Sequence, residues 1–328
     1  MVYRMNKFRK TSPQEASKHL EEIKELFRQL ASEDVDSNST FTADKEAIMR
    51  VFANTMECTK TNILVRLTLI DSMYSTQMSR RYYALEELSD ALYNVSKGKV
   101  GYLGKLFLKF AENPISTIEA FDYFTSDYDK NTKKTITRKT NLFSESYGIG
   151  KDGTDKGVAI SLISKYAYFE TDLQFPIYDS IACEMYPLVW KCCGFKKPRP
   201  KLQIKDEKGR IDGAETMVTY VQAINSLIES LDITREKKRY DLLDRFLWFV
   251  GKIIRGNLSL VLTKDEYQET TILYPPKEIK KTSKDGKVKT TIKYFDIAEV
   301  DISQLVFLKT KKILRTFFEF AQYYSIIA

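Results

Sequence analysis

Apolar residues recur at intervals of three and four along most of the chain, the spacing that places them on one face of an α-helix. The pattern predicts a string of helices in the first half and a second helical series after a loop rich in Gly, Asp and Lys. The predicted helices cover residues 13–30, 47–55, 62–78, 81–95, 101–110, 115–124, 158–169, 177–193, 214–231 and 239–254. We therefore expect a mainly α protein.

The pattern changes after Gly256. Short runs of strand-favouring residues at 258–263, 271–274 and 288–294 predict a small antiparallel β appendage near residues 258–295, with a Lys-Asp-Gly-Lys turn before the last run. A final helix at 302–325 is expected to pack back on the helical bundle. The predicted organisation is a helical region at 1–256, followed by the appendage and closing helix at 257–328.

Composition adds limits to this picture. With 328 residues, 43% hydrophobic and 29% charged, the chain resembles an ordinary folded globular protein. No apolar run approaches the roughly 20 residues of a membrane span, and the N-terminal residues lack the apolar core of a signal peptide. These features predict a cytoplasmic protein that contacts no membrane, and they indicate no obligate protein partner.

Scarce histidine and cysteine narrow the possible chemistry. The single histidine, His19, lies among charged residues on a predicted polar helix, which disfavours His-based triads. The four cysteines include no C-x-x-C pair, so neither zinc nor an iron–sulfur cluster is expected. We expect no metal and no cofactor, and any catalysis should rest on carboxylates, lysines, tyrosines or backbone groups.

The net charge of +8 is compatible with a polyanionic partner. Basic residues concentrate in three stretches that are predicted as loops or element ends, at 130–139, 191–201 and 277–289. Two of the stretches flank Asp179 in sequence, a placement that suits contacts to nucleic-acid phosphates. A solvated surface that aids solubility is the alternative for each stretch.

Asp179 stands where a long apolar helix is interrupted by Phe175-Pro176 and a second helix begins. A carboxylate in the first turn of a helix accepts hydrogen bonds from free backbone N–H groups and sits at the positive end of the helix dipole. Asp179 is therefore either a plain N-cap or an ionised group poised for chemistry on a cation.

Three segments, in this order, resemble the helix-hairpin-helix base-excision DNA glycosylase superfamily: Leu69–Ser79, Tyr147–Gly150 and Phe175–Ser180. The resemblance implies a two-lobed helical bundle that binds double-stranded DNA, with the hairpin and catalytic segment within 141–195. It implies that Gln77 fills the gap left by an extruded base. Gly148 and Gly150 would let backbone N–H groups approach a phosphate, and Arg80 and Lys151 are expected as further DNA contacts.

On the same resemblance, Asp179 would stabilise the cationic sugar or activate water, so that a damaged or modified base is released from DNA. Seven residues, Lys151 to Gly157, separate the glycines from the next helix, and no lysine falls where bifunctional members carry one. We therefore expect a monofunctional glycosylase, in repair or in defence against foreign modified DNA. Lys156 would act only in a bifunctional enzyme. Tyr178, Tyr168 and Trp190 are the candidates for the base pocket.

Two other readings remain open at this point. A non-catalytic helix-hairpin-helix protein would use the same scaffold to bind DNA without releasing a base. A helical interaction protein would have no nucleic-acid role, and its basic stretches would only be surface.

Overall fold

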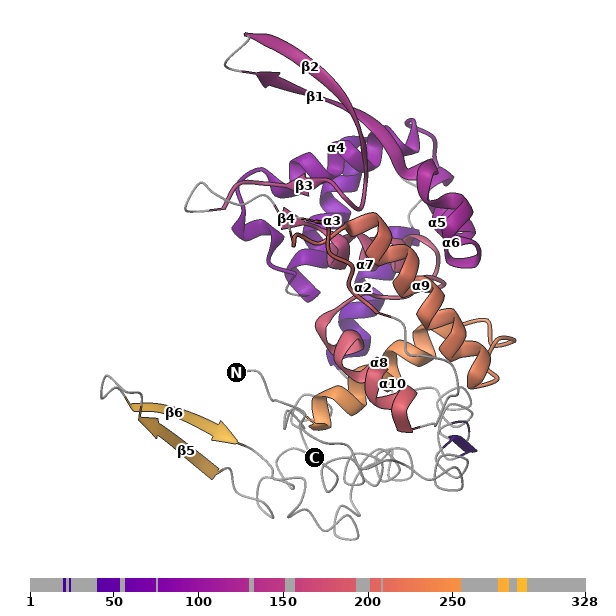
Figure 1. Cartoon of the computed structure of the whole chain (residues 1–328), viewed down its shortest axis with the longest axis vertical. Helices are drawn as coiled ribbons and strands as arrows, with labels where there is room; N and C mark the ends of the chain where they lie inside the picture. The colour runs from indigo at the N-terminus through magenta and orange to yellow at the C-terminus, as the bar shows by residue number, and fades with distance from the viewer. Residues whose placement is uncertain are drawn as a thin grey trace. The chain divides into compact units, whose positions relative to one another are not determined.

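The computed structural model describes residues 20, 21, 24, 40–53, 57–74, 76–129, 133–150, 157–192, 201–207, 209–254, 277–282 and 288–293. These residues are mainly helical and carry short two-stranded antiparallel sheets (Figure 1). The predicted mainly α class with a small antiparallel β component is confirmed.

By its internal contacts the chain divides into two units. Unit 1 combines Met1–Ala43, Glu184–Lys196 and Leu242–Ala328, and unit 2 combines Asp44–Cys183 with Lys197–Asp241. The division at residue 256 stays a prediction.

Most described helices follow the predicted apolar periodicity. They are α2 (Thr40–Ala53), α3 (Lys60–Tyr74), α4 (Ala84–Ser96), α5 (Tyr102–Glu112), α7 (Ile160–Glu170), α8 (Ser180–Cys192), α9 (Gly213–Ser230) and α10 (Arg239–Ile254). The predicted helix at 62–78 stops at Tyr74, and a short 3₁₀ turn, η1 (Met78–Arg80), follows it. The predicted helix at 302–325 lies outside the described residues, as does all but a few residues of the one at 13–30.

The helix predicted at 115–124 is wrong beyond Phe121. The short helices α6 (Pro114–Thr117) and η2 (Ile118–Phe121) lead into a strand, β1 (Asp122–Asp129). It pairs along its length with β2 (Lys134–Asn141), with Asp122 opposite Asn141 and Asp129 opposite Lys134. The basic stretch at 130–139 was predicted as a loop or an element end, and most of it instead forms β2 because backbone pairing with β1 outweighs its polar composition.

A second hairpin lies within the predicted appendage. The strands β5 (Lys277–Thr282) and β6 (Val288–Lys293) are antiparallel and flank the Lys-Asp-Gly-Lys turn. The strand predicted at 288–294 is confirmed, whereas β5 occupies part of a basic stretch that was predicted as a loop or an element end. The runs at 258–263 and 271–274 lie outside the described residues.

Aromatic packing fixes the segment between α7 and α8. The ring of Phe175 lies 5.5 Å from that of Phe107 and 6.1 Å from that of Phe110, measured between centroids. The backbone N–H of Tyr178 donates a hydrogen bond of 2.9 Å to the hydroxyl of Ser164 on α7. These contacts set where the chain enters α8.

Candidate nucleic-acid interface

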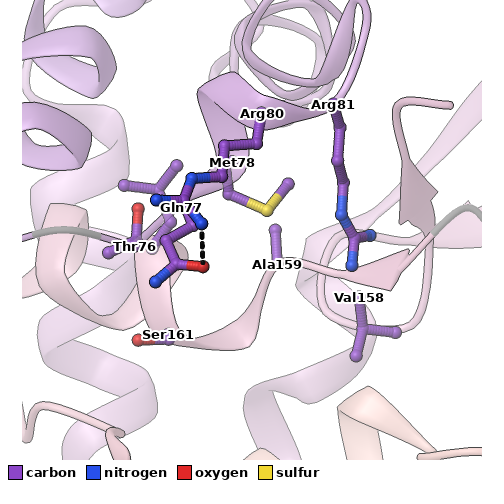
Figure 2. A pocket seen from close by; sticks show the side chains of 9 residues that line it. Thr76, Gln77, Met78, Arg80, Arg81, Val158, Ala159 and Ser161 are labelled. Atoms are coloured by element: carbon purple, nitrogen blue, oxygen red, sulfur yellow. Dashed lines mark hydrogen bonds between the residues drawn. The ribbon is translucent and has the colours of Figure 1, made fainter. Parts of the chain in front are cut away.

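A hollow of about 330 Å³ opens between the segment that follows α3 and the beginning of α7 (Figure 2). Its lining residues are Thr76, Gln77, Met78, Arg80, Arg81, Val158, Ala159, Ser161 and Leu162. Two of the predicted DNA contacts, Gln77 and Arg80, therefore meet the start of α7 in one concave site.

The wall formed by residues 76–80 is tied to α3 by Asp71. This buried carboxylate accepts hydrogen bonds from the backbone N–H groups of Met78, at 2.8 Å, and Ser79, at 3.0 Å, and from the hydroxyl of Thr76. Burial alone would raise the pKa of Asp71, but the hydrogen bonds from Ser79, Thr76 and Met78 hold this pKa below its ordinary value. The role of Asp71 was missed in the sequence, although an aspartate on the apolar face of a helix was a signal for it.

Gln77 and Arg80 stand together at the hollow. The Nη1 of Arg80 donates a hydrogen bond of 3.2 Å to the Oε1 of Gln77, and both side chains are exposed (Figure 2). The backbone of Gln77 is left-handed, with φ of 64°. A guanidinium and an amide are thus presented side by side to solvent.

Arg81 reaches across the hollow toward Val158 (Figure 2). Its guanidinium lies against Gly157, where an added Cβ would fall 1.9 Å from Nη1 and 2.6 Å from Cζ. The Nη1 of Arg81 is buried and makes no hydrogen bond within the described part of the chain. Since a buried charged donor without an acceptor is unfavourable, this position favours an anion.

The start of α7 supplies a second positive element. Ala159 is its N-cap residue, and no side chain of the described residues caps it. The first backbone N–H groups of a helix have no partner within the helix, and the helix dipole adds partial positive charge there. Ala159, Ser161 and Leu162 all line the hollow. The site therefore combines two guanidinium groups with an uncapped helix N-terminus, the arrangement that binds phosphate in other proteins.

The glycine-rich turn is held to α4 and to Tyr82 by hydrogen bonds. The N–H of Gly148 donates a hydrogen bond of 2.9 Å to Glu87, and Ile149 exchanges two backbone hydrogen bonds of 3.0 Å with Tyr82. The Gly148 N–H already has an acceptor and is not free to donate to a phosphate. This finding corrects the phosphate contact that the sequence predicted for Gly148. Gly150 follows this bridge, whereas Lys151 and Lys156 lie outside the described residues.

Strands rather than a helix precede these glycines. After β2, the two-residue strand β3 (Ser146–Tyr147) pairs with β4 (Gly157–Val158), which leads into α7. The two-helix hairpin that the resemblance implies is therefore not formed by these residues. What the segment does provide is a fixed entry into α7.

Asp179 caps α8. Its Oδ1 accepts a hydrogen bond of 2.8 Å from the N–H of Ala182, so the predicted N-cap is confirmed. The residue is half-buried and is not part of the wall of the hollow. No described residue donates to its Oδ2. One carboxylate oxygen of Asp179 therefore caps the helix.

The three aromatic residues predicted for a base pocket do not come together at the hollow. Tyr178 is half-buried and packs edge-on against Tyr220, with centroids 4.9 Å apart, and burial raises its pKa. Tyr168 is fully buried in the core. Trp190 belongs to unit 1 and stacks on Tyr186 at 5.7 Å. The assignment of Tyr168 to a pocket is corrected, because its hydroxyl is used by buried Asp241.

Within the described ranges, no group of three or more His, Cys, Asp or Glu side chains is arranged to hold a metal ion. No helix in that part of the chain is long and apolar enough to cross a membrane. Comparison of the sequence and structure with protein-family models, curated proteins and solved structures finds no match.

Proposed function

We propose that this protein binds DNA and that the hollow receives a phosphate of the DNA backbone. The observation that carries the proposal is that Arg80 and Arg81 line the same hollow as the uncapped start of α7, while neither guanidinium forms an ion pair with a described acidic residue. A phosphate between them would accept hydrogen bonds from both. Guanidinium groups match phosphate geometry well, and such charge-assisted hydrogen bonds are stronger than neutral ones.

The distribution of paired charges supports this placement. On the β1–β2 hairpin, Arg138 forms an ion pair of 2.8 Å with Glu145, and Lys139 forms one of 2.8 Å with Asp122. These cations already have carboxylate partners. Arg80 and Arg81, in contrast, form no ion pair with the described acidic residues. With a net charge of +8, the chain also attracts a polyanion at long range.

The Arg81→Gln substitution is expected to weaken duplex binding and to reduce the slope of log affinity against log salt concentration by about 1, because one phosphate contact is lost. The measurement is fluorescence anisotropy of a labelled duplex between about 50 and about 200 mM salt, the range over which such contacts weaken strongly. Arg138→Gln is the matched control and should leave the slope unchanged. An unchanged slope for Arg81→Gln, or no binding of either duplex or single-stranded DNA by the unaltered protein at the lowest salt, would refute the proposal.

A second candidate function is hydrolysis of the N-glycosidic bond of a damaged or modified base. The Oδ2 of Asp179 favours it, since that oxygen is held at a helix start and has no donor among the described residues. Cleavage of this bond leaves positive charge on the sugar, and a fixed carboxylate lowers the barrier by stabilising that charge or by activating water. A monofunctional reaction of this kind leaves an abasic site.

Asp179→Asn tests this second candidate with little structural cost, because asparagine caps helices about as well as aspartate. We expect the fold and DNA binding to persist while base release falls by about 100-fold or more. The readout is mass spectrometry of bases released from oligonucleotides and phage genomes that carry damaged or modified bases. Unaltered release by the variant would exclude Asp179 as the catalytic group, and a borohydride-trapped protein–DNA adduct would contradict a monofunctional reaction.

A further inference from the structure

Two consecutive tyrosines are strongly exposed immediately after the arginines of the hollow. Tyr82 is 60% exposed and Tyr83 is 66% exposed, and Ile149, which pairs with Tyr82, is 39% exposed. We call these three residues the tyrosine surface. An exposed pair of large aromatic side chains, next in sequence to the arginines of the hollow, is the kind of surface that marks an interaction site.

The backbone holds the tyrosine surface in place. Tyr82 and Ile149 donate to each other's carbonyl groups, with both hydrogen bonds at 3.0 Å. Residues paired in this way carry their side chains on the same face of the ladder. The carbonyl of Tyr83 accepts a hydrogen bond of 2.9 Å from Glu87 at the start of α4. The rings therefore stand on fixed backbone, which reduces the entropy lost when a ligand binds.

The sequence of two arginines followed by two tyrosines suits a partner that has both anionic groups and flat rings. Arg80 and Arg81 line the hollow, and the exposed rings of Tyr82 and Tyr83 follow without a break in the chain. Single-stranded DNA has the same combination of anionic phosphates and flat bases whose faces are open to stacking. In a duplex those faces are covered by neighbouring bases, so exposed rings gain little from it. Proteins that bind single strands combine basic groups with aromatic stacking residues in this way.

We infer that Tyr82 and Tyr83 stack on unpaired bases of single-stranded DNA while the adjoining phosphate occupies the hollow. The inference rests on the proposed DNA-binding function and adds the form of DNA that is preferred. It gives the tyrosine surface a role, because binding to DNA phosphates alone would not require exposed tyrosine rings.

The test compares two labelled single strands of equal length, oligothymidylate and an abasic oligonucleotide with the same phosphates. The full chain should bind oligothymidylate more tightly by about 5-fold to about 100-fold, the range that corresponds to stacking of one base. In the Tyr82→Ala/Tyr83→Asn variant this preference should disappear, while affinity for the abasic strand stays unchanged. Asparagine is chosen at position 83 because the backbone there is left-handed, with φ of 62°, a conformation that asparagine tolerates.

Two control variants separate stacking from other effects. Tyr82→Phe/Tyr83→Phe keeps both rings and should keep the preference. Phe124→Ala removes a ring that is 67% exposed on β1 and should also keep it. Two results would overturn the inference: equal affinity of the unaltered protein for the two strands, or a preference that survives in the Tyr82→Ala/Tyr83→Asn variant. Either result leaves the proposed function standing. Failure to bind the two strands and the duplex overturns both.

Discussion

Replacement of Asp241 by alanine is expected to lower the free energy of unfolding by about 3 to about 5 kcal/mol, the usual result of removing one partner from a buried ion pair. Asp241 is 1% exposed, forms an ion pair with Lys45 and accepts a hydrogen bond from the hydroxyl of Tyr168. Lys45 and Tyr168 are buried as well. Without the carboxylate, an ammonium group and a phenol remain inside the core and each loses an acceptor, and desolvation of the ammonium dominates the loss.

Urea denaturation followed by circular dichroism measures this change. Asp90→Ala is the matched control, because Asp90 forms an ion pair of 2.8 Å with Lys60 in which both side chains are about half exposed. Its loss should cost less than about 1 kcal/mol. The double variant Lys45→Met/Asp241→Leu should recover most of the stability, since no buried charge is left. An Asp241→Ala variant as stable as Asp90→Ala would contradict the buried-pair account.

Gly148→Ala is expected to destabilise the protein by about 1 to about 3 kcal/mol more than Gly101→Ala, the usual cost of forcing extra atoms into a packed site. Both glycines are left-handed, with φ of +73° and +70°, so both variants pay a similar backbone cost of about 1 to about 2 kcal/mol. Only at Gly148 does an added Cβ meet neighbours, at 2.5 Å from the Cβ and 3.0 Å from the Cα of Ala84. At Gly101 nothing lies within 4 Å.

Comparing the free energies of unfolding of the two variants separates the effect of packing from that of backbone strain. The affinity for duplex DNA is a second measurement. An added Cβ at Gly148 would also fall 2.9 Å from the Cβ of Arg81, so this variant should shift Arg81 and, on the proposed DNA-binding function, weaken duplex binding. Gly101→Ala should bind duplex DNA as the unaltered protein does. Equal losses of stability in the two variants would show that the close packing of Gly148 on α4 contributes nothing.

Several helices and one cap were predictable from the sequence because their signals are local. The predicted helices at 214–231 and 239–254 coincide with α9 and α10 to within about one residue. Asp212 accepts a hydrogen bond from the N–H of Glu215 and caps α9, as Asp179 caps α8. Apolar periodicity and capping residues act over one or two turns, so a single sequence contains them.

The hollow was only partly predictable, because it depends on contacts between distant segments. Gln77 and Arg80 were selected, but the approach of Arg81 to Gly157 has no local pattern in the sequence. Arg81 can approach Gly157 because Gly157 lacks a Cβ, and the two residues lie more than seventy positions apart in the sequence. The bridge between Tyr82 and Ile149, which creates the tyrosine surface, is also a long-range pairing.

The hairpin of β1 and β2 was missed for a different reason. The segment 134–141 carries Thr135, Ile136, Thr137 and Thr140, which favour strands, but its lysines and arginine directed the prediction to a loop. The structure pairs two of these cations with carboxylates of neighbouring segments. Side-chain charge describes what a segment exposes and says little about how its backbone pairs.

The left-handed backbone at Gln77 and Tyr83 brackets the segment that carries both arginines. Glycine would adopt this conformation without penalty, whereas Gln and Tyr each pay on the order of 1 kcal/mol. A chain optimised for folding alone would gain by giving up both side chains. Keeping them costs this small amount of stability, and it holds an amide and a phenol ring at defined points on either side of the two arginines.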